Sequence, residues 1–258
     1  MLTSIRGLAA LPVFAGAMFL SAPAFAQTVV NPADEVEEGS ASGLSVSANV
    51  TLASEYRFRG VDLSGGEFAI QGGVDVAHDS GFYVGTWASS LDEQTVGFGS
   101  TELDVYGGWS GDLTDGLAAD VGVIGYLYPD AGPGDFDYIE LYGSLGLTLG
   151  PAETTLGVAY APEQDSLGGD DNFYIYGDVG VGIPGTPITV KGHLGYTDGF
   201  LTFTGDGDAF DWSIGAEAAI AGTPLTLGAA YVGAEGDIPA GAYDFVDDAF
   251  VVTLGASF

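Results

Sequence analysis

Cysteine is missing from this chain and basic residues are scarce, and each of these features excludes a class of protein. There is no cysteine, so neither a disulfide nor a cysteine nucleophile is available. Only 4 of the 258 residues are Lys or Arg, against 36 Asp or Glu, and the formal net charge is −32. Because phosphate binding needs basic side chains, this balance argues against nucleic acid as a partner. A surface this acidic attracts cations instead.

Long apolar runs are also missing, with one exception at the start. Residues 7–21 are apolar, follow Arg6 and precede Ala-Phe-Ala at residues 24–26. This pattern predicts a secretory signal peptide at residues 1–26, because the run falls short of the roughly 20 residues that a spanning helix needs. Residues 27–44 are acidic and poor in apolar residues, which predicts a flexible N-terminal segment.

The remaining chain has a period of two residues. Residues 45–59, 138–149 and 210–220 show it most clearly, since aliphatic or aromatic residues alternate there with small, polar or acidic ones. Successive side chains of a strand point to opposite faces of a sheet. One face of the predicted sheet is therefore apolar, and the other is small, polar and often acidic.

Two kinds of turn separate the alternating segments. Tight turns recur about every 35 residues and alternate with longer, acid-rich loops, so the chain divides into about twelve strands, from residues 45–59 to residues 248–258. An even number of strands places both chain termini on the side of the tight turns. The tight turns are expected at residues 79–81, 112–116, 150–153, 184–187 and 221–224.

This layout predicts an all-β fold, an antiparallel transmembrane β-barrel over residues 45–258 in the outer membrane. Short turns face the periplasm in such barrels, and longer loops face outward. A closed barrel suits lipid because it leaves no unpaired backbone edge. A soluble antiparallel sandwich also alternates, but it would bury the apolar face in a core.

Two further features favour the barrel over the sandwich. The alternating chain end, with its terminal Phe258, resembles the signal that the barrel-assembly machinery reads. Aromatic residues also gather beside the longer loops, as in the interfacial belt of a membrane protein. The residues expected in this belt are Tyr56, Phe58, Phe68, Tyr128, Tyr138, Tyr160, Phe173, Tyr196, Phe210, Trp212, Tyr231 and Phe250.

Residues 54–92 resemble the opening of the TorF family of porins, and the resemblance fades along the chain but covers most of it. It implies an outer-membrane barrel and little about the solute. The matching residues are Tyr56, Arg59-Gly60, Gln71-Gly72, residues 78–81, Gly85-x-Trp87-x-Ser89, and residues 102–107, 125–129 and 138–140.

The polar face carries the candidate pore-lining residues. If it lines a water-filled lumen, the acid excess predicts a passive, cation-favouring channel for small solutes, with Arg57 and Arg59 as a local basic ladder near the mouth. The inward Gly, Ala, Ser and Thr residues favour open space. The candidates are Glu55, Arg57, Arg59, Asp75, Glu102, Asp104, Asp120, Glu140, Asp178, Lys191, His193, Asp211 and Glu217.

A non-conducting barrel is the alternative. Eight-stranded barrels are filled by side chains and sixteen-stranded ones hold channels, so about twelve strands leave both readings open. In the alternative reading the same charges form an internal salt-bridge network, and the outer loops serve a structural, adhesive or ligand-binding role.

Metal binding and catalysis find little support. The acids of residues 170–172, 206–211 and 244–248 are hard oxygen ligands, but their spacing is not that of an EF-hand, which favours solvated loops. His78, Asp79 and Ser80 share one tight turn and cannot orient one another as a triad does. We therefore predict no enzyme and no cofactor, although a protease with paired carboxylates and a His near the outer rim stays open.

The terminal residue gives the first testable prediction. Deleting Phe258 should lower the yield of assembled barrel in cells, because the aromatic ring and free carboxylate resemble the assembly signal. The protein that does assemble should keep its normal properties. Surface protease protection measures this yield, and unchanged assembly would contradict the prediction.

Overall fold

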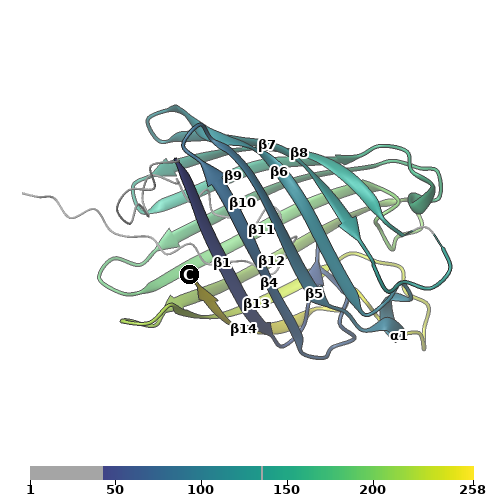
Figure 1. The fold of residues 1–258 in the computed structure, drawn as a ribbon. Coiled ribbons are helices and arrows are strands. Elements are labelled where there is room, and N and C mark those ends of the chain that lie inside the picture. The colour runs from purple at the N-terminus through teal and green to yellow at the C-terminus, as the bar shows by residue number, and fades with distance from the viewer. Residues whose placement is uncertain (1–42, 135) are drawn as a thin grey trace, which may run out of the picture.

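The computed structural model describes residues 43–134 and 136–258, in which twelve antiparallel strands close into a barrel (Figure 1). The predicted signal peptide, and the N-terminal segment up to residue 42, lie outside the described residues. The predicted all-β barrel of about twelve strands is confirmed. No helix of the described part is long and apolar enough to cross a membrane.

The strands are nine to fourteen residues long. In chain order they are β1 (Leu44–Ala53), β4 (Ala69–His78), β5 (Phe82–Ser90), β6 (Thr101–Thr114), β7 (Leu117–Leu127), β8 (Tyr138–Leu149), β9 (Ala152–Ala161), β10 (Asn172–Gly182), β11 (Ile188–Gly199), β12 (Asp208–Ala219), β13 (Leu225–Ala234) and β14 (Ala249–Ser257). The loops hold the two-residue strands β2 (Arg57–Phe58) and β3 (Val61–Asp62), helix α1 (Glu93–Val96) and the 3-10 turn η1 (Asp165–Leu167).

The barrel closes through its first strand. Val50 of β1 lies opposite Gly72 of β4 on one side and opposite Ala256 of β14 on the other. The tight turns follow β4, β6, β8, β10 and β12, as predicted, and they gather at the end where β1 starts and β14 finishes (Figure 1). The longer loops, with α1 among them, form the opposite end.

The alternation of the sequence separates the two faces of the barrel. Outward side chains include Ile214 and Phe250, which are 64% and 78% exposed. Inward side chains include Glu102 and Glu140, which are buried inside the barrel. The aliphatic residues therefore face outward and the ionisable ones inward, in the phase that the sequence predicts.

Tyrosine rings on the inner wall cover glycines of the neighbouring strand. Tyr176 pairs with Gly157 in the register between β9 and β10, and a Cβ at Gly157 would overlap the Tyr176 ring. Tyr142 covers Gly122 in the same way. The expectation that inward glycines leave open space is therefore wrong at these positions, because a neighbouring ring fills it.

The first strand is shorter than predicted. β1 ends at Ala53 instead of running to Arg59, and residues 54–68, which we call loop 1, leave the sheet. Backbone pairing to β14 continues only as far as Ser54, whose N–H donates to the carbonyl of Val252. Glu55, Arg57 and Arg59 therefore belong to loop 1 and not to the barrel wall.

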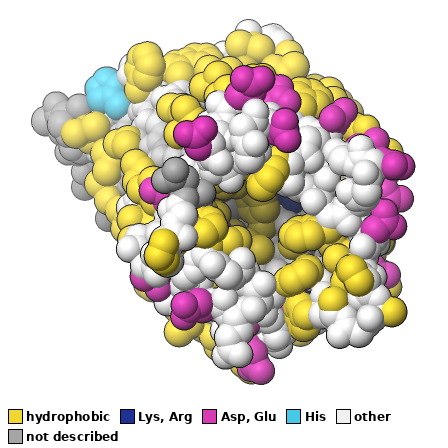
Figure 2. All heavy atoms as spheres, turned by 90° about the vertical axis from the view of Figure 1, so that its right-hand side faces the viewer, with side chains coloured by type: hydrophobic (Ala, Val, Ile, Leu, Met, Phe, Trp, Pro, Cys, Tyr) yellow, Lys and Arg dark blue, Asp and Glu magenta, His cyan; other side chains and the backbone are white. Residues whose placement is uncertain are grey.

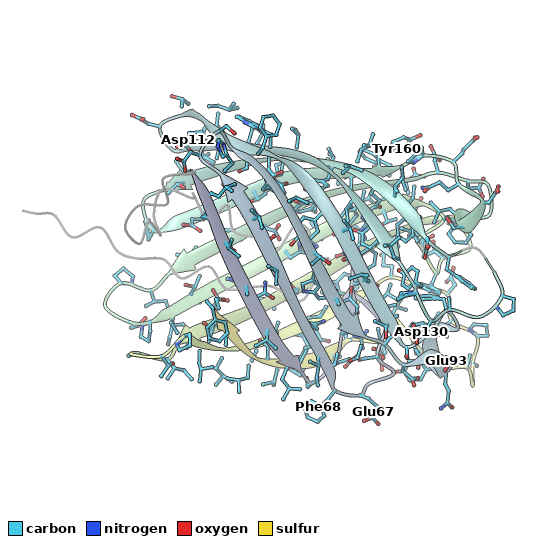
Figure 3. The ribbon with its side chains drawn as sticks, in the orientation of Figure 1. Glu67, Phe68, Glu93, Asp112, Asp130 and Tyr160 are labelled. Atoms are coloured by element: carbon cyan, nitrogen blue, oxygen red, sulfur yellow. The ribbon has the colours of Figure 1, made fainter. Side chains whose placement is uncertain are left out.

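The predicted aromatic belt is correct only in part. Phe68 and Tyr160 point away from the barrel near its loop end, whereas Asp112 marks the opposite end (Figure 3). Phe173, Phe210 and Phe250 are exposed on the outer face as well. The belt prediction is wrong for four residues that are buried inside, because they belong to loop 1 or share the phase of the inward acids: Tyr56, Phe58, Tyr128 and Tyr138.

The tyrosine–glycine packing gives a second testable prediction. Gly157→Ala should lower the free energy of unfolding by about 1–3 kcal/mol, because the new methyl group pushes the Tyr176 ring off the wall. Gly146→Ala is the matched control, since a Cβ there meets no atom of the described residues within 4 Å. The midpoint of heat-induced loss of the fast-migrating gel form measures the difference. Equal midpoints for the two variants would contradict the prediction.

Candidate functional site

Loop 1 folds into the barrel near its outer end. Its strands β2 and β3 form a small hairpin in which Arg57 pairs with Asp62 in register. The side chains of this hairpin are buried, with Arg57, Arg59 and Asp62 only 3%, 3% and 0% exposed. Charged groups without water need partners, so the contacts of these three residues decide what holds the loop.

Arg59 binds the wall formed by β8 and β10. Its Nη2 donates to both carboxylate oxygens of Glu140, at 2.9 and 2.8 Å. The guanidinium lies 4.1 Å above the ring centre of Tyr174, a cation–π contact. Burial lowers the pKa of Arg59, but attraction to Glu140 outweighs it and raises the pKa above its ordinary value, so Arg59 stays charged.

The next residue contacts the opposite wall. A Cβ at Gly60 would overlap the carbonyl oxygen of Gly233 on β13, so only glycine fits this approach. Arg59 has a φ of +48° and Gly60 one of +77°, and this left-handed pair turns the chain across the lumen. β8 and β13 are five strands apart around a ring of twelve. Loop 1 therefore spans the lumen almost diametrically.

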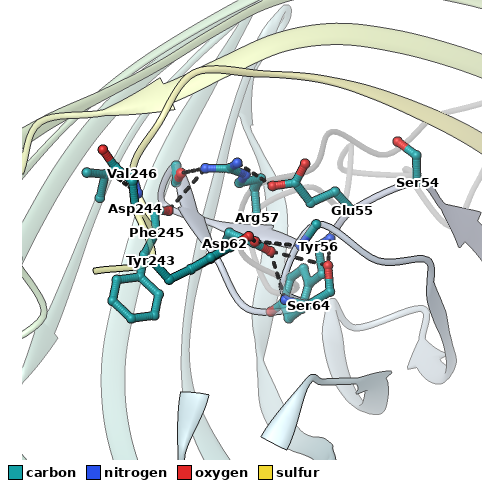
Figure 4. Close-up of polar contacts among 12 residues, drawn as sticks. Ser54, Glu55, Tyr56, Arg57, Asp62, Ser64, Tyr243, Asp244, Phe245 and Val246 are labelled. Carbon is teal, nitrogen blue, oxygen red and sulfur yellow. Dashed lines mark hydrogen bonds and ion pairs between the residues drawn. The ribbon is translucent and has the colours of Figure 1, made fainter. Parts of the chain in front are cut away.

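The loop between β13 and β14 holds the hairpin from the outside (Figure 4). Arg57 Nη1 donates to the carbonyl of Phe245 at 3.1 Å, and the N–H of Asp62 donates to the same carbonyl at 2.7 Å. The carboxylate of Asp62 accepts from the N–H of Ser64 at 2.8 Å and from the hydroxyl of Tyr243. Arg57 also forms an ion pair with Glu55.

A further anchor ties loop 1 to β6. The hydroxyl of Tyr56 donates to Glu102 Oε1 at 2.7 Å, and Tyr128 of the loop that follows β7 donates to Oε2 of the same carboxylate at 3.3 Å. Loop 1 is thus bound to β6, β8, β10, β13 and the last outer loop. Loop 1 is therefore a fixed part of the lumen and not a free surface loop.

His193 forms a second polar centre, in the middle of β11. Its Nδ1 lies 2.6 Å from Asp178 and its Nε2 lies 2.8 Å from Asp211. A neutral imidazole has one N–H, so two carboxylate partners favour the doubly protonated form. The site is buried in the lumen and not at the outer rim where the protease alternative would need it. That the protein is not an enzyme stays a prediction.

The other predicted pore-lining residues also face inward. Lys191 pairs with Glu217 at 2.7 Å. Asp75 accepts from Tyr106 at 2.6 Å, and Asp120 accepts from Tyr83 at 2.7 Å. The two arginines do not form the predicted basic ladder on a strand, because both are on loop 1 and each binds a carboxylate.

The sequence analysis missed the part played by tyrosine. Tyr106, Tyr126, Tyr142, Tyr174 and Tyr176 line the inner wall, and several of their hydroxyls bind the inward acids. The signal was present, because each of these tyrosines shares the phase of an inward acid in its own strand, which is Asp104, Asp120, Glu140 or Asp178.

Viewed from the loop end, hydrophobic and uncharged atoms border a central hollow, acidic side chains are scattered farther out on this face, and part of a Lys or Arg side chain is visible inside the hollow (Figure 2). Within the described part of the chain, each inward basic residue has a carboxylate partner. The described residues contain no group of three or more His, Asp or Glu arranged to hold a metal ion.

Comparison with known proteins places this architecture in a family. A family model matches residues 37–258. The chain belongs to the Gcw_chp family. The description of this family is "bacterial protein of unknown function". The Gcw_chp assignment does not test the narrower resemblance to TorF porins, which stays a prediction. No curated protein matches this Gcw_chp chain in sequence.

Solved porins share the fold of this Gcw_chp protein. The NanC porin superposes with a TM-score of 0.57 at 12% identity, over 83% of this chain and 99% of the porin. The KdgM porin, solved in complex with disordered oligogalacturonate, has a TM-score of 0.53 at 6% identity, over 83% and 97%. At such low identity the likeness concerns the fold alone.

The contact between Arg59 and Glu140 gives a third prediction. Trypsin cuts after Lys and Arg, and the chain has only 4 such residues, so a cut in loop 1 is easy to identify. In the parent, burial of loop 1 should protect Arg57 and Arg59 from trypsin. Glu140→Gln removes the charge that pairs with Arg59, and breaking such a buried pair costs about 3–5 kcal/mol. Loop 1 should then be released, and trypsin should cut after Arg57 or Arg59 in the intact barrel.

Glu217→Gln is the control for this experiment, since it breaks the Lys191 pair without touching loop 1. Mass spectrometry of the digested barrels locates the cut. Trypsin resistance that is the same in Glu140→Gln and the parent would show that Glu140 does not hold the loop.

Proposed function

We propose that the protein is an outer-membrane channel for passive diffusion of small solutes, narrowed near its outer end by loop 1. The observation that supports this most is the division of the barrel wall. Aliphatic side chains cover the outside, and ionisable side chains and tyrosines line the inside. Ionised groups in a lumen call for water or partners, and a water-filled lumen of this kind conducts.

Residence in the outer membrane rests on the same wall. Exposed aliphatic residues continue around the closed sheet, and exposed aromatic residues such as Phe68 and Phe250 lie near the loop end. Lipid is the environment in which such an outer face is stable. Assembly by the barrel-assembly machinery, with Phe258 as its signal, belongs to this proposal.

Cation preference is the finer part of the proposal. Glu102 and Asp120 accept hydrogen bonds from tyrosine hydroxyls instead of pairing with a base. The outer loops add further acids, and a narrow pore focuses their field. The oligogalacturonate of the KdgM complex is a polyanion, and this lumen holds its arginines in ion pairs with carboxylates. Small cations and neutral solutes therefore suit it better.

The depth of loop 1 in the lumen supports the alternative, a barrel that does not conduct. Loop 1 reaches from β8 to β13 and carries buried ion pairs, so it could close the lumen fully. The outer loops would then act in adhesion or ligand binding. Recording from single molecules separates the two functions directly.

The fourth prediction concerns conduction in planar bilayers. The parent should show small, discrete conductance steps, and replacing residues 55–67 by a short Gly-Ser linker should enlarge them severalfold. Reversal potentials in a KCl gradient should indicate cation preference. This preference should weaken with salt, because screening shortens the reach of the charges from roughly 10 Å at 0.1 M to about 3 Å at 1 M.

Two lumen variants test the electrostatic part separately. Asp120→Asn should reduce the cation preference, whereas joint replacement of Lys191 and Glu217 by Gln removes one charge of each sign and should leave it unchanged. An anion-selective parent would overturn the electrostatic argument. Silence of both the parent and the linker variant would establish the non-conducting alternative.

A further inference from the structure

The pocket that holds Arg59, formed by Glu140, Tyr126, Tyr138 and Tyr174, has the composition of a receptor for an organic cation. Glu140 presents both carboxylate oxygens to one guanidinium nitrogen. The Arg59 guanidinium lies over the Tyr174 ring, and Tyr126 holds Glu140 in place through a hydrogen bond of 3.0 Å. Tyr126 and Tyr138 stack with their ring centres 4.5 Å apart. A carboxylate beside aromatic faces selects planar or compact cations.

Arg59 uses only part of what this pocket offers. Its Nη2 makes both hydrogen bonds to Glu140, whereas Nε and Nη1 are buried and have no hydrogen-bond partner among the described residues. A guanidinium has five N–H donors, and leaving buried donors unsatisfied weakens its hold. Arg59 therefore fills this pocket without satisfying all of its own hydrogen-bond donors.

A carboxylate without a partner lies on the next strand but one. Asp104 of β6 is opposite Tyr126 in the register between β6 and β7, and it is 0% exposed. Neither of its oxygens has a hydrogen-bond partner within the described part of the chain. A buried carboxylate without a partner is costly unless it takes up a proton or a cation, so Asp104 is a candidate second ligand for a cation in the lumen.

The backbone of loop 1 makes its hold on the pocket reversible. Arg59 has a left-handed φ of +48°, which residues other than glycine rarely adopt. The contacts of the guanidinium keep this conformation in place. An external cation that takes over Glu140 would remove those contacts and let the loop relax.

We propose that this pocket binds the guanidinium or primary ammonium group of a diffusing solute, and that Arg59 is a tethered occupant which such a solute displaces. The inference rests on the proposed channel function and deepens it, because it names a solute class and a way for loop 1 to be released from the wall. Binding to the pocket is nevertheless measurable without conduction, so the two proposals fail separately.

The first experiment empties the pocket and refills it. Arg59→Ala is purified in detergent, and its heat-unfolding midpoint is followed with millimolar guanidinium chloride, sodium chloride or urea. Guanidinium should raise the midpoint, whereas urea, which has the same shape without the charge, should not. Adding Glu140→Gln to Arg59→Ala should weaken the guanidinium effect about tenfold or more in concentration, because it removes a charge-assisted hydrogen bond.

Refolding covers the case in which Arg59→Ala does not assemble by itself. Guanidinium at the same millimolar level, present during refolding, should then restore assembled barrel, and urea should not. A midpoint or a refolding yield that guanidinium leaves unchanged overturns the proposal. An effect that persists with Glu140→Gln overturns it as well.

The second experiment tests displacement in the parent. Chymotrypsin cuts after aromatic residues, so release of loop 1 should expose the bond after Phe58. Cleavage there should increase with guanidinium and not with urea or sodium chloride, and mass spectrometry identifies the site. Unchanged cleavage would show that Arg59 is a fixed structural residue. Guanidinium binding in a barrel that never conducts would support the pocket and reject the channel.

Discussion

Backbone hydrogen bonding is the constraint on which the rest of this structure depends. Every N–H and C=O group of a strand in lipid must find its partner inside the sheet, which forces β1 to pair with β14 as well as with β4. Closure then gives each strand one face toward the outside of the barrel and one toward the lumen. The alternation of side chains, the tight turns at one end and the longer loops at the other all follow from it.

The same closure buries ionisable side chains inside the barrel. Inward charges such as Glu140 and Asp211 are buried in a confined lumen, where unpaired ionised groups are costly. The protein supplies partners from two sources. The strands themselves provide tyrosine hydroxyls and the basic residues Lys191 and His193, and loop 1 brings Arg59 to Glu140 from outside the sheet.

This second source links stability to the proposed channel. A loop whose charges pair with the wall, as Arg59 does with Glu140, is held firmly while those pairs last. The loop also crosses the lumen, which is the solute path of the proposed channel. In the proposed channel, Arg59 therefore both satisfies Glu140 and narrows the lumen, so a solute that competes for Glu140 acts on both.

The sequence by itself determined the barrel, its twelve strands, the positions of the tight turns and the inward phase of the acids, because a period of two and the turn residues are local properties of the chain. It also placed the charged residues of loop 1 together. It could not show that β1 stops at Ala53, since Tyr56 and Phe58 continue the alternation beyond that point. Only the tertiary structure decided that loop 1 turns inward, because the partners that draw Arg59 across the lumen, Glu140 and Tyr174, lie about 80 or more residues away and meet it only once the barrel has closed.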